Sequence, residues 1–68
     1  MRKLRYFQIP GMNVGEVLGE FNERRGEFRI AETDIINVQV LPSTGQKIGT
    51  PKGIEEAKVE VLIFYWSE

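Results

Sequence analysis

The chain contains neither cysteine nor histidine among its 68 residues. Without cysteine it can form no disulfide bond, no thiolate metal site and no cysteine nucleophile. Without histidine it lacks the commonest general base and the commonest metal ligand, and no serine can belong to a Ser-His-Asp triad. We therefore predict a protein that is not an enzyme, with no catalytic residues, no metal ligands and no cofactor.

The chain also lacks a long apolar run and a marked excess of charge. No segment approaches the about 18 apolar residues that a membrane-spanning helix needs, and the apolar run near the N-terminus is too short for a signal peptide. The formal net charge is −1, which gives no overall attraction to nucleic acid or to an acidic membrane. We expect a cytoplasmic protein with no membrane contact, and we do not expect a nucleic-acid partner.

The length of the chain predicts a single domain over residues 1–68. A domain of this size buries only about 60% of the surface that its unfolded chain exposes, so it is marginally stable alone. Small domains of this kind gain much of their stability from oligomerisation.

The most informative stretch is 59–66, with the sequence V-E-V-L-I-F-Y-W. Apolar and polar residues alternate at its start, and from Leu62 onward both sides of the strand are apolar. This pattern is typical of a central strand that is covered on both faces. Only one helix is predicted, and it can cover one face of this strand. The other face would then be left exposed, so we expect it to be covered by a second copy of the chain or by another partner.

That helix is predicted over residues 13–25. Asn13 is a good N-cap, and Glu16 three residues later completes a capping-box pattern. Four apolar positions follow the i, i+3, i+4, i+7 spacing of one helix face: Val14, Val17, Leu18 and Phe21. Gly26 is a suitable residue to end the helix.

Two further strands are predicted, over residues 3–9 and 35–41. The sequence does not decide which side of the first strand faces the core. Leu4 and Tyr6 lie on one side, Phe7 and Ile9 lie on the other, and either pair is apolar enough to be buried. Residues 27–33 form either a short edge strand or a connector. Residues 42–57 hold three glycines and two prolines, which predicts a long, mobile hairpin loop before the last strand.

These elements predict an α+β domain of the β-α-β-β type. A helical crossover leaves a gap between the first two strands, and the last strand fills it in a three-stranded, mostly antiparallel sheet of order 1-3-2. The helix is then expected to cover one face, which carries these residues: Val59, Val61, Ile63, Ile36, Val38 and Val40.

The opposite face of the sheet is the candidate interaction surface. Its predicted members are Leu62, Phe64, Trp66, Asn37, Gln39 and Phe7, with Tyr6 as the alternative to Phe7. We expect it to be half of a homo-oligomer interface, a dimer first, and another protein is the alternative partner. The aromatic side chains could instead stack a flat ligand or single-stranded nucleic acid, although the chain has ten acidic residues.

Two segments resemble those of a family of very small bacterial proteins known from expression during sporulation. They are I-I-N-V-Q-V-L-P-S-T at residues 35–44 and V-E-V-L-I-F-Y-W-S-E at residues 59–68. Family members also look like strand, helix, strand, strand, and Asn22, 35–40 and 63–65 stand in comparable places. The family has no established reaction, so the resemblance implies an accessory role and no site residues.

The length and the order of elements are also similar to those of dodecins, which are small flavin-storing shells. In dodecins a Trp of the second strand stacks on the flavin, and a Gln near the start of the last strand helps to hold it. The only Trp of this chain is Trp66 in the last strand, and Lys58 lies in the region of that Gln. The similarity therefore implies a tendency to multimerise and no flavin site.

Overall fold

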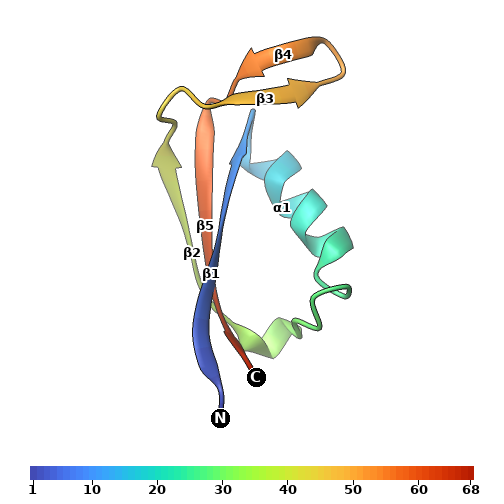
Figure 1. The fold of residues 1–68 in the computed structure, drawn as a ribbon, viewed down its shortest axis with the longest axis vertical. Helices are drawn as coiled ribbons and strands as arrows, with labels where there is room; N and C mark the ends of the chain where they lie inside the picture. The colour runs from blue at the N-terminus through green and yellow to red at the C-terminus, as the bar shows by residue number, and fades with distance from the viewer.

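The computed structural model describes all residues from 1 to 68 (Figure 1). Its elements in chain order are β1 (Lys3–Gly11), α1 (Val14–Arg24), the short 3-10 helix η1 (Glu32–Asp34), β2 (Ile35–Pro42), β3 (Lys47–Thr50), β4 (Gly53–Glu56) and β5 (Val59–Ser67). The predicted order of strand, helix, strand, strand is confirmed, and β3 and β4 are added between the last two predicted strands.

The main sheet has three antiparallel strands in the order β1-β5-β2. The prediction of an α+β fold with the last strand in the centre is therefore confirmed. In the register of the sheet, Phe7 of β1 and Val38 of β2 both pair with Ile63 of β5. Because directly paired residues share a face, these three side chains point toward the same side as α1.

The helix begins and ends within one residue of its predicted bounds. The side chain of Asn13 accepts a hydrogen bond from the backbone N–H of Glu16 at 2.8 Å, as expected of an N-cap. At the other end the N–H of Arg25 donates to the carbonyl of Phe21. The left-handed residue that follows is Arg29, with φ 57°, rather than Gly26. Residues 27–33 form no strand: turns up to residue 29 lead into η1, which begins at residue 32.

The core lies between α1 and the part of the sheet formed by β1 and β5. Its buried members are Val17, Phe21, Ile30, Val61, Ile63 and Tyr65. The ring of Phe7 stacks on Tyr65 with 5.2 Å between the centroids and meets Phe21 edge-on at 5.7 Å. The ring of Phe7 on β1 therefore lies between Phe21 of the helix and Tyr65 of β5.

The helix does not cover β2, and the prediction that it would do so is wrong. Ile36, Val38 and Val40 are 48%, 42% and 49% exposed, and α1 contacts β1 and β5 instead. The reason is width: a helix is about 10 Å across, and neighbouring strands are about 4.8 Å apart, so one helix covers about two strands.

Residues 42–57 are also more ordered than predicted. They contain the β3–β4 hairpin, which is joined by the two-residue turn Pro51–Lys52. Gly53 follows this turn with φ 116°, a backbone conformation that favours glycine. Figure 1 shows the hairpin at one end of the molecule, where it extends toward the side of α1 and away from β2.

Candidate interaction surface

The face of the sheet opposite α1 carries five of the six residues predicted for the interaction surface. Leu62, Phe64 and Trp66 alternate along β5 with the buried residues of the core. On β2, Asn37 pairs with Phe64 and Gln39 pairs with Leu62, so these five side chains share one face. We call this side of the sheet the open face.

Phe7 does not belong to the open face, and its assignment there was wrong. It pairs with Ile63 and packs against Tyr65 and Phe21 in the core. Tyr6 takes its place, because it pairs with Phe64 and its ring lies 6.1 Å from the Phe64 ring. Both alternating sets of β1 contain an aromatic residue, so the sequence pattern alone left the two sides equivalent.

The open face is apolar and largely exposed. Leu4 and Tyr6 of β1 are 60% and 61% exposed, and Leu41 and Trp66 are 38% and 39% exposed. Gln8, Asn37 and Gln39 add uncharged amide groups on the same side. Away from Glu60, the surface is thus built from exposed or half-buried apolar and amide side chains.

The one acidic residue among the paired strand positions of the open face is Glu60, and it is only 3% exposed. Its two carboxylate oxygens accept hydrogen bonds from Gln8 Nε2 at 2.7 Å and from Thr44 Oγ1 at 3.1 Å. Thr44 belongs to the segment between β2 and β3, which therefore passes over this carboxylate. The charge of Glu60 is withdrawn from the surface, and the open face is nearly neutral.

A second exposed apolar region lies on the other side of β2. It consists of Ile36, Val38 and Val40, which we call the β2 stripe. Val40 and Val38 pair with Val61 and Ile63, both of which are fully buried. The β2 stripe thus continues the hydrophobic core beyond the edge of the helix, where it is open to solvent.

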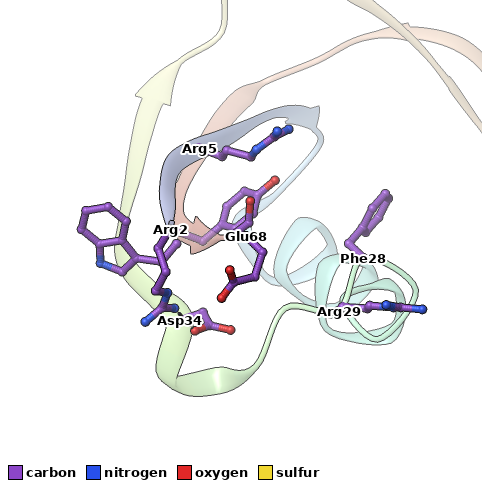
Figure 2. A pocket seen from close by; sticks show the side chains of 9 residues that line it. Arg2, Arg5, Phe28, Arg29, Asp34 and Glu68 are labelled. Carbon is purple, nitrogen blue, oxygen red and sulfur yellow. Dashed lines mark hydrogen bonds and ion pairs between the residues drawn. The ribbon is translucent and has the colours of Figure 1, made fainter.

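Basic side chains gather elsewhere, around a pocket of about 620 Å³ at the end of the sheet where the chain termini lie (Figures 1 and 2). Arg2 forms an ion pair with Asp34, and Glu68 lies in the same pocket. Figure 2 shows that the guanidinium groups of Arg5 and Arg29 lie apart from each other, on different elements. The arrangement mixes both signs of charge and forms no single cradle for an anion.

A second hollow lies between the hairpin and the start of α1. It has a volume of about 550 Å³ and is lined by carboxylates of the helix, Glu16 and Glu20, and by Thr50 and Lys52 of the hairpin. No group of three or more acidic side chains is placed to hold a metal ion. No helix has the length and apolar character to cross a membrane.

Comparisons of the chain with protein-family models, with curated proteins and with solved structures gave no match. The resemblances to the sporulation-expressed proteins and to dodecins therefore stay predictions from the sequence. The sequence pattern located most of the open face, whereas the β2 stripe was assigned to the core and is the part of the surface that it missed.

Proposed function

We propose that this chain is a non-enzymatic accessory protein of the bacterial cytoplasm that acts by associating with further copies of itself through its sheet. The observation that carries the proposal is the exposure of apolar side chains on the open face of the sheet and on the other side of its edge strand β2. Contiguous exposed apolar side chains are typical of surfaces that bind another protein. These side chains lie on regular strands rather than in loops, so their positions are fixed by the sheet, as those of an interface would be.

The size of the core supports the proposal. Nine of the 68 residues are buried, whereas ten large apolar side chains are exposed. Removing one Val, Leu or Phe side chain from water contributes about 1.5–3 kcal/mol, and small domains have total stabilities near the low end of about 5–15 kcal/mol. Covering even two of these side chains would therefore add substantially to the stability of the chain.

The direct test is the molecular mass in solution, by light scattering at micromolar concentration, of the wild type and two variants. Trp66→Glu places a charge on the open face. Ile54→Glu is the matched control, because Ile54 is 75% exposed but lies on the hairpin outside the main sheet. We expect a dimer or larger species for the wild type and for Ile54→Glu. A folded monomer of Trp66→Glu would place the interface on the open face, whereas an unchanged mass would place it elsewhere on the sheet. A wild-type monomer would contradict the proposal and would turn the search toward a different protein partner.

The alternative function is binding of a flat ligand on the open face. The Tyr6–Phe64 ring pair beside Trp66 favours it, since aromatic rings are common platforms for stacking. Nucleic acid is the less favoured ligand, because the paired strand positions of the open face carry no Lys or Arg to meet phosphates. Trp66 is the only tryptophan, so its fluorescence reports on this face. An unchanged spectrum on titration with flavins, nucleotides and oligonucleotides would exclude the alternative.

A further inference from the structure

The two edges of the main sheet differ in how they are protected against pairing with another strand. Edge strands of monomeric proteins usually carry charged residues or proline, which discourage pairing with a further strand. β1 has such protection in Lys3, Arg5 and Pro10. β2 has no charged residue at all, and only its ends are interrupted, by a bulge between Ile35 and Asn37 and by Pro42.

We propose that a second copy of this chain pairs with β2 in antiparallel orientation, around a two-fold axis at Val38, to form a continuous six-stranded sheet. This inference rests on the proposed self-association and specifies its partner and geometry. A strand that pairs with a copy of itself must be complementary to its own reversed sequence. The sequence of β2 can therefore be written beside its own reverse to see which residues would face each other.

With the two-fold axis at Val38, apolar residues face apolar residues and amides face amides. Val38 faces Val38 of the second copy, and Ile36 faces Val40, so apolar side chains meet along the β2 stripe. On the open face, Asn37 faces Gln39, so two amides that can exchange hydrogen bonds lie side by side. A shift of the register by two residues in one direction would place Leu41 opposite Asn37, and a shift in the other direction would place Gln39 opposite Ile35. Both shifts put an apolar side chain against an amide. The sequence of β2 thus favours one register.

The surroundings of β2 leave room for the second copy. α1 lies over β1 and β5, and Figure 1 shows the hairpin directed away from the free edge of β2. The two-fold axis is perpendicular to the sheet, because antiparallel edge pairing keeps the same face of both copies on the same side. The two β2 stripes would then form one continuous apolar surface between the two helices. The two open faces would join into one surface on the opposite side of the sheet.

Disulfide trapping tests the register directly, because the chain has no cysteine and each substitution introduces a single thiol. Directly opposed residues have Cβ atoms about 4.5–5.5 Å apart, close to the spacing that a disulfide requires. Val38→Cys should therefore form a covalent dimer with a mild oxidant. In Val40→Cys the two thiols lie about 13 Å apart along the strands and should not join. Mixing Ile36→Cys with Val40→Cys should restore the bond.

A charge at the axis provides a second measurement. Val38→Lys places two ammonium groups opposite each other, which should raise the dimer dissociation constant about 100-fold. A mixture of Val38→Lys with Val38→Glu should associate again, since opposite charges then meet. Val38 is already 42% exposed in the single chain, so the fold should tolerate both changes, and circular dichroism checks this. Ile54→Lys on the hairpin is the control and should associate like the wild type.

The outcomes separate the two proposals. Selective crosslinking at Val38, together with dissociation of Val38→Lys, supports pairing at β2. A wild-type oligomer that Val38→Lys leaves intact, with no preference for crosslinking at Val38, overturns the inference and leaves self-association through another surface. A wild-type monomer overturns both.

Discussion

Gly11, at the end of β1, is the residue at which the smallest change should have a large effect. It is buried, and a Cβ atom built on it would overlap the Cγ2 methyl of Val17 in α1. Gly11→Ala should destabilise the fold by about 1–3 kcal/mol, because the helix must move away from the sheet or Val17 must leave its preferred rotamer. Urea denaturation followed by Trp66 fluorescence measures the free energy of unfolding.

Gly19 is the matched control for Gly11. It lies inside α1, and a Cβ atom there would have no neighbour within 4 Å. Gly19→Ala should therefore stabilise the protein by about 0.5–1 kcal/mol, through the better helix propensity of alanine. Equal losses of stability in both variants would show that close packing at Gly11 is not the cause.

Glu60 is the second residue at which a small change should alter the stability, because its carboxylate is buried and hydrogen-bonded. Its buried carboxylate accepts a hydrogen bond from Gln8, and Gln8→Leu removes that donor. The loss should cost about 1–3 kcal/mol, because one oxygen of the buried carboxylate is left without a donor, while Thr44 still donates to the other oxygen. The double variant Gln8→Leu with Glu60→Leu should recover most of this loss, since no buried carboxylate remains and the exposed Thr44 hydroxyl can bond to water instead. A double-mutant cycle from urea denaturation gives the coupling, and additive losses would contradict it.

At the scale of the elements, β5 should be the strand on which the fold depends most. It pairs with both other strands of the main sheet, and Val61 and Ile63 are fully buried. Ile63→Ala should cost about 2–5 kcal/mol, enough to unfold much of a domain this small. Val38→Ala on the exposed edge strand is the control and should cost far less. A loss below about 1 kcal/mol for Ile63→Ala, small for a core truncation, would mean that the centre of the sheet is wrongly assigned.

The elements that could be predicted from the sequence are those with strong local signals. α1 has an N-cap and a periodic apolar stripe, and β5 has an apolar run on both sides. The hairpin was missed because its strands are four residues long and contribute little to the core, although Pro51, Lys52 and Gly53 form a recognisable turn. Short strands of this kind are set by the turn more than by hydrophobic pattern.

The candidate site was predictable only in part, because some of its features depend on how separate elements pack against each other. Alternation along β5 and β2 placed Leu62, Phe64 and Gln39 on one face, since alternation is a local property. The choice between Tyr6 and Phe7 depends on which aromatic fits against Phe21 of the helix. The exposure of the β2 stripe depends on where α1 lies across the sheet. Neither of these tertiary relations is encoded in the periodicity of a single segment.

At the scale of the whole molecule, the chain is extended for its length. Its principal dimensions are 41 × 21 × 16 Å and its radius of gyration is 12.8 Å, whereas a compact chain of this length has a radius of gyration of about 11 Å. The hairpin at one end contributes to the long dimension (Figure 1). The extended shape is consistent with a chain that leaves much of its apolar surface uncovered.

If copies associate through the sheet, the stability of the fold should depend on protein concentration. An oligomer that forms only from folded chains shifts the equilibrium toward the folded state by mass action. The melting temperature of the wild type, followed by circular dichroism, should therefore rise as the protein concentration is increased. Val38→Lys should show a weaker dependence. A wild-type melting temperature that is the same at all concentrations would contradict association.

The position of β5 also has a consequence for how the protein is made. β1 and β2 do not pair with each other, because β5 lies between them. A ribosome synthesises β5 after the other strands, so β1 and β2 leave the exit tunnel with no partner strand available. The main sheet can then form only in a single late step that joins distant parts of the chain, which is slow compared with local folding. A premature stop codon before β5 would remove the whole main sheet rather than one third of it.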